Sequence, residues 1–256
     1  MAKKQNHPAD AFLHLKNLPT IWCPGCGIGI VVNIFIQTVN KMKIKKENIF
    51  IVSSGISCTG KISDHLNLKS IESEDPFKET DKLKKKNPKS RMVIFFNDND
   101  LMVNGIDGLL KSCHAGTEVL AIYINSFVCN ILFFHKKFMH FNFRKQDSHI
   151  EPKDVFNLPL LMKECGASYI ARWTPLHCRR LAYSLKETIL KAGFSFIEVI
   201  SPCLMYYASS GYEGKTIDRM GYYLKNAKIE NGYPMEELKT EDIENLIIGK
   251  FLNKTQ

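Results

Sequence analysis

The sequence predicts an α/β fold in which a mostly parallel sheet is covered by helices on both faces. Short, uninterrupted apolar runs recur along the chain, and segments of helical length and periodicity separate them. Strands buried on both faces are apolar throughout, and their alternation with helices is typical of a doubly wound sheet. Ligands of such sheets bind beyond the carboxyl ends of the strands, so functional residues are expected in the loops that follow the apolar runs.

The first half of the chain contains three of the expected strands. Residues 27–42 are apolar on nearly all sides, and the length of this run favours a largely buried helix over a strand. Residues 48–53, 91–97 and 118–125 are short apolar runs, which predicts buried strands. A helix is expected near residues 100–113, so strand and helix alternate.

The second half of the chain continues this alternation. Helices are expected near residues 155–165 and 181–192, and strands at residues 168–173 and 194–201. Beyond Pro202 the chain becomes polar and rich in tyrosine. An amphipathic helix is expected at residues 241–252, outside the alternating pattern.

Length and composition fit one globular domain. The chain has 256 residues, of which 45% are hydrophobic, and disordered or fibrous chains are less apolar. We expect residues 12–205 to form the α/β domain and residues 206–256 to form an extension that contacts a partner. Residues 69–91 are highly charged and are expected to be a surface loop or an exposed helix. The net charge of +9 suits nucleic acid, an acidic protein or a phosphorylated cofactor.

Neither a secretory signal nor a membrane span is expected. The opening MAKKQNHPAD is not followed by an apolar segment, and polar residues interrupt the longest apolar stretch, residues 119–134. We therefore expect a cytoplasmic protein with no membrane partner. Eight cysteines in such a chain predict reduced thiols, for which metal or cluster ligation is a better hypothesis than disulfides.

Four cysteines are placed as ligands of one metal centre. Cys23 and Cys26 lie in the hexapeptide WCPGCG, where two intervening residues let both sulfurs reach one metal. Cys58 follows the expected strand 48–53, and Cys203 follows the strand 194–201, so both would emerge at the same edge of a parallel sheet. Zinc remains an alternative, although structural zinc sites usually draw on two close cysteine pairs. The remaining cysteines are expected in the core, with Cys129 as a spare ligand: Cys113, Cys129, Cys165 and Cys178.

A second site is predicted at the ends of the next two strands. Asn97-Asp98-Asn99-Asp100 ends one strand and precedes a helix, and an acid there can coordinate Mg²⁺ while the helix N-terminus receives a phosphate. The alternative is that Asp98 or Asn99 only caps the helix. The following strand ends at Asn125-Ser126, so oxygen ligands from two adjacent strand ends are expected to share one hard cation.

These motifs together resemble the beta subunits of the 2-oxoacid:ferredoxin oxidoreductases, thiamine-diphosphate enzymes that decarboxylate 2-oxo acids oxidatively with coenzyme A. The family's opening WCPGCG is matched at residues 22–27, its GIGCSG by GISCTG at residues 55–60, and its EVLSPC by EVISPC at residues 198–203. The resemblance covers residues 12–205 and implies a thiamine-diphosphate-binding fold. It also implies a 4Fe–4S cluster on Cys23, Cys26, Cys58 and Cys203.

The resemblance implies thiamine diphosphate and Mg²⁺ as further cofactors. The family's Gly-Asp-Gly motif aligns with Asn97-Asp98-Asn99, and its second metal ligand aligns with Ser126. Asp98, Ser126 and the carbonyl group of Val128 would hold the metal. The cofactor-binding positions that the resemblance implies are Gly55, Ile56, Ser57, Thr59, Asn97, Asp98, Asn99, Asn125 and Asn130. Lys61, just past the Cys58 segment, is the candidate catalytic residue, because its charge could bind a carboxylate or a phosphate. The alternative is that Lys61 is a solvated surface lysine.

The chain also departs from the family pattern. Asparagines replace both motif glycines, the family's His-Gly-Arg segment is absent from residues 71–76, and bulky residues occupy 130–134. A degenerate subunit that keeps the cluster and the subunit interface is therefore the alternative function. The expected partners are an alpha subunit, with gamma and delta subunits as further candidates, ferredoxin, a 2-oxo acid and coenzyme A. Nucleic acid, through the basic and aromatic residues 135–145, is the disfavoured rival.

Overall fold

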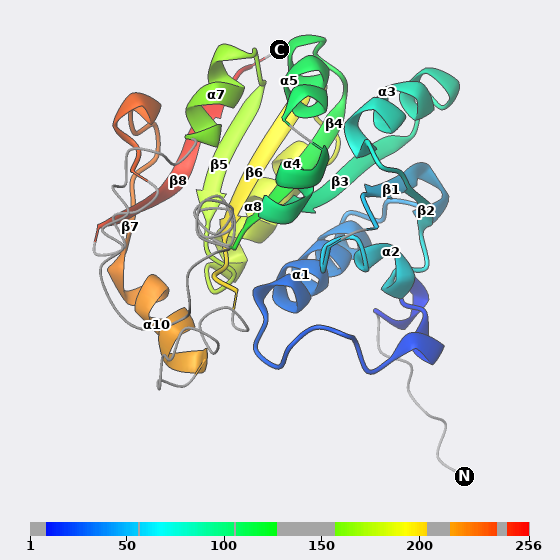
Figure 1. Cartoon of the computed structure of the whole chain (residues 1–256), viewed down its shortest axis with the longest axis horizontal. Coiled ribbons are helices and arrows are strands. Elements are labelled where there is room, and N and C mark those ends of the chain that lie inside the picture. The colour runs from blue at the N-terminus through cyan, green and yellow to red at the C-terminus, as the bar shows by residue number, and fades with distance from the viewer. Residues whose placement is uncertain are drawn as a thin grey trace, which may run out of the picture.

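A computed structural model of the chain describes residues 9–55, 57–104, 106–126, 157–203, 216–239 and 245–255. Its centre is one eight-stranded sheet with the order β2-β1-β3-β4-β6-β5-β8-β7 (Figure 1). The first six of these strands run parallel, β8 is antiparallel to β5, and β7 is parallel to β8. The strands are β1 Ile49–Ser53, β2 Lys69–Glu72, β3 Arg91–Asn97, β4 Val119–Asn125, β5 Tyr169–Trp173, β6 Phe194–Ile200, β7 Ala227–Ile229 and β8 Leu246–Asn253.

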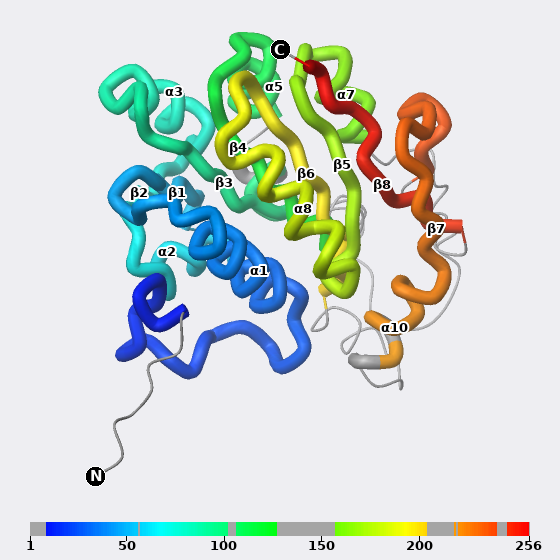
Figure 2. The backbone as a smooth tube through the Cα atoms, turned by 180° about the vertical axis from the view of Figure 1, so that it is seen from behind, coloured from blue at the N-terminus to red at the C-terminus, as the bar shows by residue number. Residues whose placement is uncertain are grey.

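Helices cover both faces of the sheet. Figure 1 shows α3, α4, α5 and α7 in front of it, and Figure 2, from behind, shows α1 packed beside α8. The α-helices are α1 Gly27–Lys41, α2 Ile62–His65, α3 Pro76–Lys86, α4 Asp98–Asn104, α5 Asp107–His114, α7 Leu158–Glu164, α8 Cys178–Thr188 and α10 Thr216–Asn226. Short 3-10 helices occur at Asp10–Phe12, Leu15–Asn17, Lys46–Asn48 and Met235–Glu237. None of the described helices has both the length and the apolar character needed to cross a membrane.

The strands are apolar throughout because both of their faces are buried. Ile49 and Ile51 of β1 belong to the core under α1, whereas Phe50 and Val52 belong to the core under α3. Successive side chains of a strand point to opposite faces, so each apolar run contributes to two cores. The predicted fold class, a mostly parallel sheet covered on both faces, is confirmed.

The charged segment 69–91 contains one strand that the sequence did not reveal. Its second part forms α3, in agreement with an exposed helix, but its beginning forms β2 at the edge of the sheet. Three of the four β2 residues are exposed, so the strand lacks the apolar run by which the buried strands were identified. Near residues 100–113 the structure has two helices, α4 and α5.

The amphipathic helix expected at residues 241–252 is wrong, because residues 246–253 form strand β8. The β8 residues Ile247 and Ile248 are β-branched and favour a strand. Gly249 lies so close to the backbone that follows β7 that a Cβ atom there would be 2.5 Å from the carbonyl oxygen of Glu230. Part of the expected C-terminal extension therefore completes the sheet. Its contact with a partner stays a prediction.

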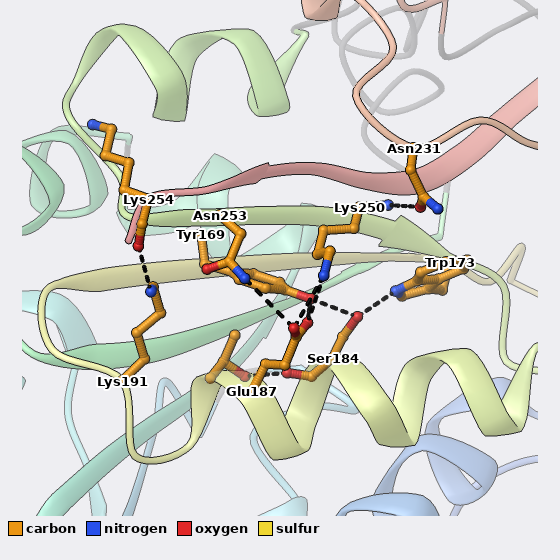
Figure 3. A network of polar contacts seen from close by, with 10 residues as sticks. Tyr169, Trp173, Ser184, Glu187, Lys191, Asn231, Lys250, Asn253 and Lys254 are labelled. Atoms are coloured by element: carbon orange, nitrogen blue, oxygen red, sulfur yellow. Dashed lines mark hydrogen bonds and ion pairs between the residues drawn. The ribbon is translucent and has the colours of Figure 1, made fainter. Parts of the chain in front are cut away.

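A polar network attaches β8 to the rest of the sheet. The Tyr169 hydroxyl on β5 is hydrogen-bonded to Ser184 Oγ at 2.8 Å and to Glu187 Oε2 at 2.9 Å, both on α8 (Figure 3). Glu187 Oε1 also forms an ion pair of 3.0 Å with Lys250 Nζ on β8. Burial raises the pKa of Tyr169, so its hydroxyl stays protonated. One helix, one parallel strand and the antiparallel strand thus share a single cluster of polar groups.

Replacing Tyr169 by phenylalanine tests this attachment. The ring stays in the core, but the Glu187 carboxylate loses a donor, so the free energy of unfolding should fall by about 1–2 kcal/mol in urea denaturation. Tyr183→Phe is the matched control, because the Tyr183 side chain is 58% exposed and its loss of a hydroxyl should change little. Equal effects of the two substitutions would contradict the role assigned to this network.

Candidate cluster and cofactor site

Four consecutive loops at the carboxyl edge of the sheet hold the predicted site residues. Strands β1, β3, β4 and β6 are neighbours in this order. The segments that follow these strands contain Cys58, Asp98, Ser126 and Cys203 in turn, with Asp98 as the first residue of α4. The chain runs from β1 to β2 on one side, and from β2 it crosses over β1 to β3 on the other side, so the order of strands reverses beside β1. Ligands of doubly wound sheets bind at such reversals.

Cys23-Pro24-Gly25-Cys26 forms a tight turn. The backbone N–H of Cys26 donates to the carbonyl oxygen of Cys23 at 2.9 Å, and Gly25 has a φ of 82°. Proline followed by a residue with positive φ is the signature of a type II turn, and glycine adopts this φ without strain. The turn places both cysteines at its two ends, directly before α1 begins at Gly27.

Two contacts bring this turn to the other two cysteines. The indole N–H of Trp22 donates to the carbonyl oxygen of Cys58 at 2.9 Å. Gly27 approaches the end of β6 so closely that a Cβ atom there would lie 2.0 Å from Ser201 Oγ, two residues before Cys203. The WCPGCG segment therefore lies against both the loop after β1 and the loop after β6.

The four thiols lie within electrostatic reach of one another. Burial raises the pKa of Cys26 to about 11, and Cys23, Cys58 and Cys203 each add to this rise. The pKa of Cys58 is raised by burial, and after that by Cys203, Cys23 and Asp100. Each thiolate would oppose the charge of the next, as expected when like charges are grouped. The structure therefore places the four predicted ligands at one edge of the sheet, while the described residues contain no group of three or more His, Cys, Asp or Glu that could hold a metal ion.

The other cysteines that the structure describes lie elsewhere. Cys113 is buried in the core with its thiol donating to the carbonyl oxygen of Met162, as expected. Cys165 is half-buried beside the same core. The expectation of a core position is wrong for Cys178, which is exposed at the start of α8. Cys129 lies outside the described residues.

Asp98 and Ser126 are in direct contact. Asp98 Oδ2 accepts the backbone N–H of Ser126 at 3.0 Å and its hydroxyl at 2.6 Å. Asp98 Oδ1 accepts the hydroxyl of Tyr123, a residue that the sequence does not mark as functional because it lies inside an apolar strand. Its ring packs between Phe96 and Phe196 on one face of the sheet, which fixes the direction of its hydroxyl. Asp98 is 1% exposed, and the two hydroxyls and the Ser126 N–H hold its carboxylate at the sheet edge.

The asparagine that replaces the first motif glycine holds its own turn. Asn97 Oδ1 accepts the backbone N–H of Asn99 at 3.0 Å and that of Asp100 at 3.3 Å. Neither Asn97 nor Asn99 has a positive φ. The turn after β3 therefore forms without the backbone conformation for which glycine is usually needed.

The side chains of Asn125 and Lys61 interact with carboxylates of this chain. Asn125 Nδ2 donates to Glu198 Oε1 at 2.8 Å, below the strand ends, and Arg172 Nε pairs with Glu198 Oε2 at 2.6 Å. Lys61 Nζ lies 3.5 Å from Asp64 Oδ2 on the surface. The predicted positions Ile56, Val128 and Asn130, and residues 135–145 proposed for nucleic acid, lie outside the described residues.

The fold and its carboxyl edge define a doubly wound α/β protein with grouped thiols beside a carboxylate–hydroxyl pair. No protein-family model matches the chain. The 2-oxoglutarate synthase subunit KorB of Methanothermobacter thermautotrophicus is 30% identical over 99% of this chain and 90% of the relative. The same subunit of Methanothermobacter marburgensis is 30% identical over 98% of this chain and 88% of the relative.

A solved structure shows the same fold. The 2-oxoglutarate:ferredoxin oxidoreductase of Magnetococcus marinus, with 2-oxoglutarate, coenzyme A and succinyl-CoA bound, aligns with a TM-score of 0.74. The alignment covers 100% of this chain and 87% of that chain at 15% identity. At this identity the similarity shows the fold alone. Because both relatives are 30% identical over nearly the whole chain, the chain belongs to the 2-oxoacid:ferredoxin oxidoreductase beta subunits. It is therefore a subunit of an oxidoreductase.

Proposed function

We propose that this beta subunit holds a 4Fe–4S cluster on Cys23, Cys26, Cys58 and Cys203 and thiamine diphosphate with Mg²⁺ at Asp98 and Ser126. The reaction is the oxidative decarboxylation of a 2-oxo acid with coenzyme A, and its electrons pass to ferredoxin. The observation that supports this proposal most is the grouping of four thiols from three distant segments at one sheet edge.

The thiol group suits an iron–sulfur cluster. A cluster needs four thiolates from a partly enclosed site, and these four are half-buried or exposed. The raised pKa values of Cys26 and Cys58 mean that these two thiols are protonated in the chain without metal, and ligation would release their protons. Zinc would be held by the same donors, and metal analysis distinguishes the two.

The Asp98–Ser126 pair suits a hard divalent cation. Mg²⁺ prefers carboxylate, hydroxyl and carbonyl oxygens, and Asp98 with Ser126 supplies the first two from neighbouring strand ends. The Tyr123 hydroxyl and the Ser126 N–H fix the carboxylate in one orientation. When bound, thiamine diphosphate supplies the carbanion chemistry of decarboxylation, and these residues would hold its diphosphate through the metal.

The proposal includes an obligate partner chain. Relatives are named as subunits, and the resemblance implies that the acid that activates the thiamine ring comes from an alpha subunit. The test is reduction of ferredoxin, dependent on a 2-oxo acid and coenzyme A, by the chain co-purified with its alpha subunit. The chain alone should show none of this activity. Activity of the isolated chain, or an inactive complex that contains all cofactors, would overturn the proposal.

Replacing Asp98 by asparagine separates cofactor binding from the cluster. The change removes the charge opposite Mg²⁺, so we expect the affinity of the complex for thiamine diphosphate, measured by calorimetry with Mg²⁺, to fall at least about a hundredfold. The iron content should not change. Asp107→Asn is the control, because the Asp107 side chain is 81% exposed on α5.

Absence of thiamine diphosphate binding by the unaltered complex would favour the degenerate subunit instead. The two asparagines in place of the motif glycines are the observation that keeps this alternative open. In that case the chain would keep the cluster and its subunit interface without catalysis.

A further inference from the structure

The Asp100 carboxylate lies at the centre of a network of hydrogen bonds. Its carboxylate accepts the hydroxyls of Ser54, Ser57 at 2.9 Å and Thr59 at 2.7 Å. It also accepts the backbone N–H of Asn97 at 2.8 Å. Asp100 is 3% exposed, so its charge is compensated by these donors and shielded from water.

The four donors come from two loops that belong to different sites. The three hydroxyls lie in the loop after β1, and Ser57 and Thr59 flank Cys58 on both sides. The Asn97 N–H lies at the end of β3, next to Asp98. Asp100 is therefore the direct link between the loop of a predicted cluster ligand and the turn of the predicted metal ligand.

The loop after β1 is built to close on this link. A Cβ atom at Gly60 would lie 2.7 Å from the Gly55 backbone, so the two ends of the loop touch. Ser57 Oγ lies 2.5 Å from Thr59 Oγ1 and accepts the backbone N–H of Thr59 at 3.2 Å. Cys58 thus projects from a closed loop whose inner side chains point to one carboxylate.

We propose that Asp100 is a positioning residue of the cluster site: it ties the Cys58 loop to the turn that contains Asp98 and places a buried negative charge beside Cys58. Its functional meaning rests on the proposed cluster. Adding an electron to a cluster near a fixed negative charge is opposed by that charge. Asp100 therefore lowers the midpoint potential of the cluster and fixes its distance from the metal site.

The first experiment examines the chain without metal by hydrogen–deuterium exchange. Asp100→Asn and Thr59→Val should each increase amide exchange in residues 54–60 about tenfold, the effect of losing one charge-assisted hydrogen bond. Exchange in β4 and in residues 91–96 of β3 should not change. Thr59→Ser keeps the hydroxyl and should exchange as the unaltered chain does. If Asp100→Asn does not fold, Thr59→Val and Thr59→Ser still decide the result.

Asp81→Asn is the matched control. The Asp81 carboxylate also accepts two hydroxyls, of Ser112 at 2.8 Å and Thr117 at 2.7 Å, but on the α3–α5 side of the molecule. It should affect exchange near those residues and leave residues 54–60 unchanged. Unaltered exchange of residues 54–60 in both Asp100→Asn and Thr59→Val would overturn the proposed link.

The second experiment measures the midpoint potential of the loaded complex by redox titration with electron paramagnetic resonance. Asp100→Asn should shift the potential to a more positive value, whereas Asp81→Asn and Thr59→Val, which keep the Asp100 charge, should not. A potential unchanged by Asp100→Asn would overturn the electrostatic role. If the unaltered complex contains no iron–sulfur cluster, the proposed function fails, and the exchange experiment still decides whether Asp100 links the two loops.

Discussion

Replacing Gly27 by alanine should remove the cluster from the purified protein without altering any cysteine. The added Cβ would lie 2.0 Å from Ser201 Oγ and 2.7 Å from Pro175 Cγ, far inside contact distance. The Cys23–Cys26 turn must then move away from the end of β6, where Cys203 follows. We expect iron content to fall to a small fraction of the unaltered value and unfolding free energy to fall by about 1–3 kcal/mol, the usual effect of overpacking.

Gly29→Ala is the control for this substitution. It lies in the same helix, but its Cβ would meet only Trp22 Cε3, at 3.7 Å, which is ordinary contact. Alanine favours the helix by up to about 1 kcal/mol, so this variant should bind iron normally and be no less stable. Full iron content in the Gly27→Ala protein would mean that the approach of α1 to β6 does not assemble the ligands.

Replacing Arg172 by methionine should cause the largest loss of stability among these substitutions. Arg172 and Glu198 pair at 2.6 Å on adjacent central strands, and their side chains are 0% and 2% exposed. Methionine preserves much of the volume but leaves the Glu198 charge buried without its partner. Breaking such a pair typically costs about 3–5 kcal/mol, which should appear in urea denaturation.

Two further variants separate the unpaired charge from lost packing. Adding Glu198→Gln to Arg172→Met removes the stranded charge and should recover a large part of the stability. Lys111→Met breaks the ion pair with Asp107, in which the two side chains are 78% and 81% exposed. The free energy of unfolding of this variant should equal that of the unaltered chain within experimental error. A single Arg172→Met variant as stable as the Lys111→Met control would contradict this account.

The central strands were predictable because burial on both faces leaves a continuous apolar run. Residues 91–97 were predicted as a strand with the same bounds as β3, and the Cys58 and Cys203 loops follow from strand ends that parallel pairing brings to one edge. The local turn at Cys23–Cys26 was also visible, since proline and glycine between two cysteines define its geometry.

Features that depend on distant partners were not predictable. Strand β8 pairs with β5, and the pairing of Ile170 with Leu252 shows that the two strands are some 80 residues apart in the chain. No role was predicted for Asp100 within the stretch Asn97–Asp100, and only the return of the Ser57–Thr59 loop reveals its donors. Tyr123 resembled an ordinary core aromatic residue. The residues next to it in the strand are apolar and give no sign that its hydroxyl donates to Asp98.

The sharpest measurement is iron and acid-labile sulfide analysis of the anaerobically purified complex, with electron paramagnetic resonance of its reduced form. The account predicts about four iron and four sulfide per site formed by this chain, with a signal that disappears when Cys58 or Cys203 is replaced by serine. Stoichiometric zinc without sulfide, or a full iron complement in both serine variants, would contradict it.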